Sequence, residues 1–190
     1  VVVGPGTGLG SAVLIPGAQQ PLVLATEAGQ TSLAPGNALE RAILEVLAQG
    51  SRHVSCEQVL SGPGMLNLYR ALCALQSTRA EHGTPEAVTS AALRGADARA
   101  RQALEVFCGL FGSFVGDLAL LYGAGGGIWL AGGILPQIRE FFVRSNFVER
   151  FLDKGRMRAF LERVPVRLME HGQLGVIGAA GWYLEHHDSG

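Results

Sequence analysis

The feature that most constrains the fold is a glycine-rich segment near the start of the chain, residues 4–10, with the sequence GPGTGLG. Glycine at every second position leaves few side chains to bury but supplies backbone N–H groups that can converge on an anion. Phosphate is the usual anion for such a loop, and Thr7 adds a hydroxyl donor. The next residues, 11–15, favour β-structure and end at Pro16, so the segment predicts a hairpin with a phosphate-sized tip.

Other glycine-rich motifs agree less well with this segment. A Walker A loop requires Gly-Lys followed by Ser or Thr, and residues 4–10 contain no lysine. A dinucleotide-binding fingerprint must open a helix, whereas the apolar run after Gly10 is too short for one. An ordinary glycine-rich hairpin turn remains an alternative on the evidence of the loop alone.

Composition narrows the class of protein. The 190 residues are 48% apolar with a net charge of −1, which indicates one sizeable globular domain and, without a basic cluster, no nucleic-acid footprint. Cys56, Cys73 and Cys108 are odd in number and lie in apolar surroundings, which argues for a reducing, cytoplasmic compartment and against a disulfide frame or a zinc site.

The apolar stretch 104–135 contains Asp117 and several glycines, so we expect a buried helix and strand rather than a membrane span.

The order of predicted elements indicates an α/β protein with a mixed sheet. An N-terminal β-meander is followed by several helices, then by two further strands separated by helices. The predicted strands cover residues 1–3, 11–15, 22–25, 128–131 and 166–169. The predicted helices cover residues 37–47, 65–75, 85–93, 97–122 and 174–187.

Three further segments contain candidate binding residues. Glu27 and Gln30 directly follow a strand, where polar groups of a site often lie. Glu57 follows Ser55 in a capping box, which offers a purely structural explanation for its charge at a helix N-terminus. The apolar strand at 128–131 is bracketed by glycines, which lets backbone approach a flat group closely. For Asp117 we expect a structural role.

The motifs as a set resemble those of bacterial glucokinases of the actin–hexokinase fold. The resemblance covers nearly the whole chain, in order and in spacing. It rests on residues 6–10 (GTGLG), 60–64 (LSGPG), 67–71 (NLYRA), 130–134 (LAGGI), 141–142 (FF) and 153–156 (DKGR). One departure is that the family commonly has Glu-Gly-Gly-His where residues 27–30 read EAGQ, so Gln30 replaces a histidine. The cysteine cluster of the zinc-bearing repressor and kinase group with this fold is absent from the sequence.

The resemblance implies a ribonuclease-H-like domain that binds ATP, with Mg²⁺ bridging the phosphates, and glucose. It places the ATP phosphates at Gly6, Thr7 and Gly8, and the adenosine at Gly132, Gly133 and Ile134. It places the sugar at Glu27, Gln30 and Glu57, whose carboxylates and amide can accept hydrogen bonds from hydroxyl groups.

The resemblance also implies that residues 1–190 are the C-terminal large domain of a two-lobed sugar kinase. The first phosphate loop and the general-base aspartate are then expected in an N-terminal lobe, so we assign no catalytic residue and no metal ligand here. We expect the isolated chain to be inactive, with exposed and mobile loops at 4–10 and 27–30. The predicted function is phosphorylation of glucose by ATP in a homodimer without nucleic-acid or membrane partners. A sugar- or nucleotide-sensing regulator is the alternative, and an actin-like assembly ATPase is disfavoured by Glu27 and Glu57.

Overall fold

The computed structural model describes residues 1–18, 20–169 and 174–187, and its centre is a five-stranded mixed sheet. The strand order is β3-β2-β1-β4-β5, in which the first three strands are antiparallel and β4 and β5 run parallel to β1. The strands are β1 (Val2–Pro5), β2 (Leu9–Ile15), β3 (Leu22–Thr26), β4 (Ile128–Leu130) and β5 (Val166–Leu168). The predicted α/β class with an N-terminal meander and a mixed sheet is confirmed.

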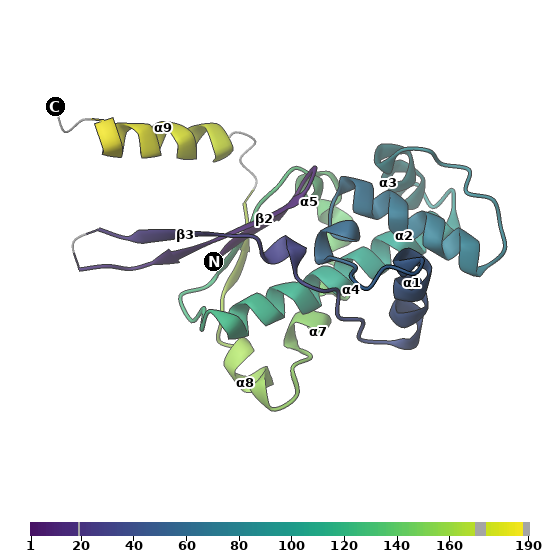
Figure 1. The fold of residues 1–190 in the computed structure, drawn as a ribbon, viewed down its shortest axis with the longest axis horizontal. Helices are drawn as coiled ribbons and strands as arrows, with labels where there is room; N and C mark the ends of the chain where they lie inside the picture. The colour runs from purple at the N-terminus through teal and green to yellow at the C-terminus, as the bar shows by residue number, and fades with distance from the viewer. Residues whose placement is uncertain (19, 170–173, 188–190) are drawn as a thin grey trace.

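Helices fill the two long connections, between β3 and β4 and between β4 and β5 (Figure 1). Between β3 and β4 lie η1 (Ala28–Gln30), α1 (Ala38–Ala48), η2 (Cys56–Gln58), α2 (Gly62–Leu75), α3 (Pro85–Leu93) and α4 (Ala98–Leu121). Between β4 and β5 lie α5 (Ile134–Gln137), α6 (Arg139–Phe142), α7 (Phe147–Leu152), η3 (Gly155–Met157) and α8 (Arg158–Leu161). The last element is α9 (Leu174–His187).

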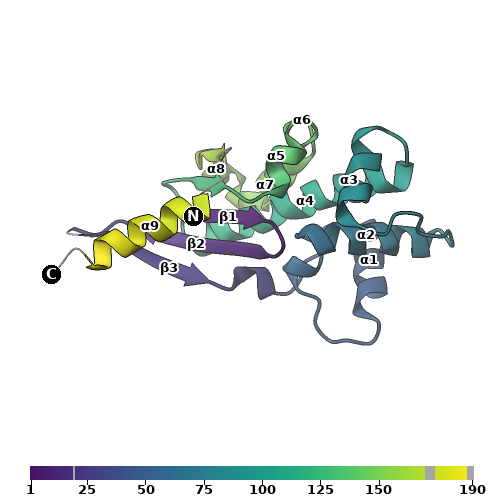
Figure 2. The ribbon, with the colours of Figure 1, turned by 90° about the horizontal axis from the view of Figure 1, so that it is seen from above.

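The long helix α4 lies at the centre of the helical part of the protein. It contacts α2, α3 and α7, and most of its side chains are buried. Figure 2 shows α1–α3 gathered at one end of α4 and the sheet at the other. The helix is long and apolar enough to cross a membrane by length and composition alone, but most of it is buried inside the protein. The prediction of a buried helix is confirmed.

Two glycines on α4 let α7 approach its backbone. A Cβ added at Gly112 would overlap the carbonyl oxygen of Phe147, and one at Gly116 would lie 2.8 Å from the carbonyl oxygen of Phe151. These two glycines therefore permit the close packing of α7 on α4. Cys56, Cys73 and Cys108 are all buried and unpaired, as their spacing predicts.

Side chains cap several of the helices, and one helix begins earlier than predicted. Asn37, Thr84 and Asp97 each accept hydrogen bonds from the first turn of the helix that follows. The helix predicted over residues 65–75 was placed too late, because α2 already begins at Gly62. The Ser61 side chain caps this helix, and Pro63 fits its first turn because a helix leaves those N–H groups without partners.

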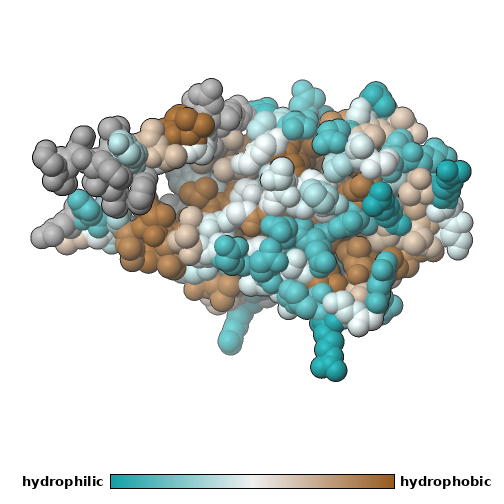
Figure 3. All heavy atoms as spheres, turned by 45° about the horizontal axis from the view of Figure 1, so that its top comes forward, coloured by the Kyte–Doolittle hydropathy of each residue, from teal (hydrophilic) through white to brown (hydrophobic). Residues whose placement is uncertain are grey.

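Hydrophobic side chains remain exposed at the end of the sheet where β2 joins β3 (Figure 3). The large hydrophobic residues exposed on these two strands are Leu14, Ile15, Leu22, Val23 and Leu24. This end of the sheet extends away from α1–α8, toward the side of the molecule that also holds α9 (Figure 1), and these side chains remain exposed. The opposite end of the β1–β2 hairpin, at residues 6–8, lies against α2 and carries the candidate site.

Candidate functional site

The glycine-rich loop forms the tip of the β1–β2 hairpin, as predicted. Pro5 pairs with Leu9 across the ladder, which leaves residues 6–8 as the connection. The Gly6 amide donates to the Gly8 carbonyl at 2.8 Å, and the Gly6 carbonyl accepts from Gly62 at 2.8 Å. Within the described part of the chain, the amides of Thr7 and Gly8 have no protein acceptor. The loop therefore offers two amides and the exposed Thr7 hydroxyl to a ligand, fewer donors than the glycine count suggests.

Hydrogen bonds to neighbouring elements hold this loop. The bond from Gly62 ties it to the first residue of α2, and the Leu9 amide donates to Glu57 Oε2 at 2.7 Å. The expected exposure of loops 4–10 and 27–30 is therefore only partly confirmed. Thr7, Gly10, Glu27 and Gln30 are exposed, Gly6 and Gly8 are half-exposed, and Pro5, Leu9, Ala28 and Gly29 are buried. The 14-residue helix α2 also directs its N-terminus, the positive end of its dipole, toward the loop.

Glu57 lies at the junction of the loop with the predicted sugar site. It occupies the first turn of η2, where Gln58 reaches back to the Ser55 amide at 2.9 Å and completes the predicted capping box. Its Oε2 accepts from Leu9, and its Oε1 accepts from Gln30 Nε2 at 3.0 Å. A carboxylate has about four lone-pair positions, so these two bonds leave capacity for a further donor.

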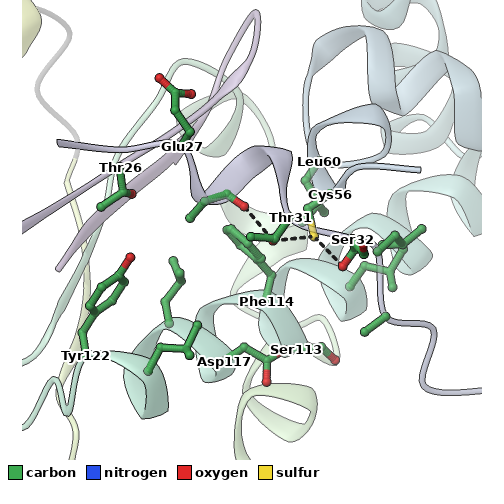
Figure 4. A pocket seen from close by; sticks show the side chains of 16 residues that line it. Thr26, Glu27, Thr31, Ser32, Cys56, Leu60, Ser113, Phe114, Asp117 and Tyr122 are labelled. Carbon is green, nitrogen blue, oxygen red and sulfur yellow. Dashed lines mark hydrogen bonds between the residues drawn. The ribbon is translucent and has the colours of Figure 1, made fainter. Parts of the chain in front are cut away.

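The segment that carries Glu27 and Gln30 packs directly on the hairpin. A Cβ at Gly29 would overlap the carbonyl oxygen of Leu9, so only glycine permits this approach. The Gln30 side chain turns to Glu57, whereas the exposed Glu27 carboxylate points away from the neighbouring cavity (Figure 4). The structure thus brings Gln30 and Glu57 together, with Glu27 at the start of the same short helix.

The second glycine pair follows β4, and its two members differ. Gly132 has a φ of +90°, and a Cβ there would overlap the carbonyl oxygen of Pro5. Gly4 faces it, since a Cβ at Gly4 would lie 2.8 Å from the backbone of Ala131. Gly133 is exposed with a φ of −77°, and a Cβ there would meet nothing within 4 Å. Gly132 therefore joins two parts of the protein, and Gly133 faces open space.

A groove of about 410 Å³ connects the two glycine loops. Four of the six predicted nucleotide residues line it, namely Gly6, Thr7, Gly133 and Ile134. Gly8 and Gly132 do not, because Gly8 faces Glu57 and Gly132 faces Pro5. The rest of the groove is lined by residues that the sequence analysis missed, Gly62, Pro63, Met65, Pro85, Glu86, Thr89 and Gln137. Of these residues, only Gly62 and Pro63 lie in a segment that carries the family resemblance, 60–64, and Pro85 and Glu86 open a predicted helix.

A second cavity of about 340 Å³ lies between η1 and α4 (Figure 4). Asp117 lines this cavity and forms an ion pair with Lys154, the residue that precedes η3. The Asp117 Oδ1 and Lys154 Nζ atoms are 2.6 Å apart. This contact supports the structural role expected for Asp117. Burial raises the pKa of the Cys56 thiol, which also lines the cavity, so that this cysteine remains protonated and weakly reactive.

Comparison with known proteins gives consistent matches. The sequence model of the glucokinase family matches residues 1–186. A "Glucokinase-like protein" of Xylella fastidiosa is 56% identical over 97% of this chain and 55% of its own length. A "Glucokinase" of Nitrobacter hamburgensis is 45% identical over 97% of this chain and 58% of its own length. The chain therefore spans about half the length of the curated relatives it matches.

Solved structures agree with the sequence matches. The crystal structure of a glucokinase from an Antarctic psychrotroph superposes with a TM-score of 0.88 at 41% identity, covering 95% of this chain and 56% of that one. A transcriptional regulator of the ROK family superposes with a TM-score of 0.57 at 13% identity, over 88% of this chain and 40% of that one, a likeness of fold alone. These matches confirm the actin–hexokinase type of fold expected from the sequence.

Proposed function

Because the chain belongs to the glucokinase family, we propose that the protein containing it transfers the γ-phosphoryl group of ATP to the 6-hydroxyl of glucose. The observation that carries this proposal is the hydrogen bond between Glu57 and the Leu9 amide, 2.7 Å long. It joins the proposed sugar carboxylate to the proposed phosphate loop, so the acceptor hydroxyl and the transferred phosphoryl group would meet at one place. Phosphoryl transfer depends chiefly on such positioning and on charge stabilisation.

The nucleotide would occupy the groove between the two glycine loops. The free amides of Thr7 and Gly8 and the Thr7 hydroxyl would donate to phosphate oxygens at one end. The exposed backbone of Gly133 and the side chain of Ile134 would lie against the adenosine at the other. Gly132 would support this contact indirectly, through its packing on Pro5. Mg²⁺ bound with the nucleotide would offset the charge of the phosphates, and we assign none of residues 1–190 to hold it.

The sugar would bind beside the η1 segment. Glu57 retains lone pairs for a sugar hydroxyl after its bonds to Leu9 and Gln30, and Glu27 offers an exposed carboxylate at the start of η1. Gln30 can donate or accept but carries no charge, unlike the protonatable histidine common at this position in the family. We infer that Gln30 acts chiefly by orienting Glu57.

We further propose that the general base belongs to a second lobe and that residues 1–190 form the large domain. The relatives are almost twice as long as the aligned part, which leaves room for such a lobe. Glu57 is a poor candidate for the base, since it already accepts two hydrogen bonds as an anion. Lobe closure would then complete the site and exclude water.

We also propose a homodimer, which light scattering of the full-length protein would test.

A coupled assay on the full-length protein tests the proposal. With glucose and Mg-ATP we expect glucose 6-phosphate and ADP in equal amounts. Glu57→Gln keeps the shape of the side chain but removes the charge, and bonds to charged groups contribute about 1.5–3 kcal/mol. Glucose affinity should therefore fall at least about tenfold. Glucose binding without any phosphoryl transfer would favour the sugar-sensing regulator, and failure to bind glucose at all would refute the proposal.

A further inference from the structure

Glu57 is shared between the two halves of the proposed site. Its two carboxylate oxygens have different partners, since Oε2 accepts from Leu9 of the hairpin and Oε1 accepts from Gln30 of η1. The Leu9 bond joins residues 48 positions apart in the sequence, and the Gln30 bond joins residues 27 positions apart. One side chain therefore fixes the distance between the phosphate loop and the sugar segment.

The backbone carbonyl of Glu57 accepts a hydrogen bond, as both of its carboxylate oxygens do. Its carbonyl oxygen accepts from Ser61 Oγ at 2.8 Å, and the same hydroxyl accepts from the Gly64 amide at the start of α2. The first residue of that helix in turn donates to the Gly6 carbonyl. The phosphate loop is thus attached at Gly6 to α2 and at Leu9 to the Glu57 side chain.

Gly8 leaves room for this arrangement. A Cβ added at Gly8 would lie 2.6 Å from Glu57 Oε2, and its next nearest contacts would be other atoms of the same carboxylate. The obstacle is the end of a flexible side chain rather than backbone. An alanine at this position would therefore be accommodated by moving the Glu57 carboxylate, with the fold intact.

We propose that Glu57 is a positioning residue for the phosphate loop as well as a sugar ligand, so that sugar binding and nucleotide binding are coupled through it. The inference rests on the proposed function. A sugar hydroxyl that donates to Glu57 fixes the carboxylate, which fixes the Leu9 amide and the conformation of residues 6–8. Coupling between binding sites is reciprocal, so a change in the loop must alter sugar affinity even when no nucleotide is present.

Gly8→Ala in the full-length protein is the direct test, with Gly10→Ala as the matched control. Gly10 is exposed, lies two residues further along the hairpin, and a Cβ there would meet nothing within 4 Å. Calorimetric titration of glucose without nucleotide should show an affinity loss of about tenfold or more for Gly8→Ala, the change that 1.4 kcal/mol represents. The Gly10→Ala variant should remain within about twofold of the wild type.

A second measurement separates positioning from sugar contact. Glucose should tighten the binding of a non-hydrolysable ATP analogue to the wild type by about fivefold or more, within the usual range of coupling between sites. Glu57→Gln should weaken the analogue at least about threefold without glucose present, an effect that a mere sugar ligand would not cause. This variant is informative even if Gly8→Ala proves poorly folded.

The outcomes are distinguishable. A wild-type protein that phosphorylates glucose, with Gly8→Ala and Gly10→Ala equal in glucose affinity, overturns the coupling and leaves the proposed function standing. Unchanged analogue binding in Glu57→Gln overturns it as well. A wild-type protein that neither binds nor phosphorylates glucose refutes the proposed function itself.

Discussion

The adjacent residues Gly132 and Gly133 should respond in opposite ways to the same substitution. In Gly132→Ala the new residue must adopt a φ of +90°, which costs an L-residue about 1–2 kcal/mol. Its Cβ also overlaps the carbonyl oxygen of Pro5, and overpacking of this kind costs about 1–3 kcal/mol. In Gly133→Ala the φ is an ordinary −77° and the Cβ enters open space, so neither term arises.

The expected difference is large enough for a thermal unfolding measurement. The two costs at Gly132 amount to about 2–5 kcal/mol, and in a domain of this size each kcal/mol lowers Tm by about 2–4 °C. We therefore expect Gly132→Ala to lower Tm by about 4–20 °C and Gly133→Ala to change it by less than about 2 °C. Equal Tm values for the two variants would refute the assignment of Gly132 to the contact with Pro5.

A larger substitution at Gly133 tests the proposed nucleotide site. A valine at Gly133 would project into the groove proposed for adenosine, so Gly133→Val in the full-length protein should raise the KM for ATP at least about tenfold, with the KM for glucose within about twofold. Gly126→Val is the control, because Gly126 is an exposed glycine near the other end of β4 with open space around it. An ATP KM that is equally insensitive in both variants would show that the groove is not the adenosine site.

Three further predictions concern buried charge, acid stability and the extent of the site. Glu40→Gln should destabilise the chain by about 3–5 kcal/mol in urea unfolding, because Arg150 would lose its paired carboxylate, whereas Glu162→Gln in an exposed pair should cost under about 1 kcal/mol. Burial opposes ionisation of Asp97, but bonds from Tyr69 and two backbone amides outweigh it and lower its pKa, so its stabilisation is lost as pH falls through that lowered pKa. Asp97→Asn should accordingly flatten the stability curve below about pH 4. The purified 190-residue chain should show no glucose phosphorylation in a coupled assay, and turnover that disappears on mutation within it would show that it contains the base.

Local signals in the sequence account for most of the fold. The hairpin was predictable because alternate glycines and a following β-run leave little else for residues 4–15 to form. The caps at Asn37 and Asp97 were predictable because each side chain satisfies amides only a few residues away. The start of α2 was not, since Gly-Pro-Gly usually interrupts a helix, whereas here the Ser61 side chain caps the helix and Pro63 lies in its first turn.

The sequence predicted which residues belong to the candidate site better than it predicted the contacts that these residues make. Motif resemblance selected Glu57 and Gly132, but their contacts depend on how distant segments meet. The pairing of Glu57 with Leu9 and the packing of Gly132 on Pro5 have no local signal in the sequence. Glu86 and Thr89 of the groove were missed for the same reason, since they reach it only through the packing of α3 beside α2.

The ion pair between Lys154 and Asp117 has a practical consequence for chemical labelling. Lys154 is the only lysine in the sequence, and its side chain is 17% exposed, with the ammonium group bound to a carboxylate. Acylating reagents attack the neutral amine, so this lysine should react slowly while the pair is intact. Because the pair joins α4 to the segment after α7, a rise in acylation at this one position would report that the two segments have separated. Among the side chains of residues 1–190, Lys154 is therefore a single lysine probe of separation between α4 and the segment after α7.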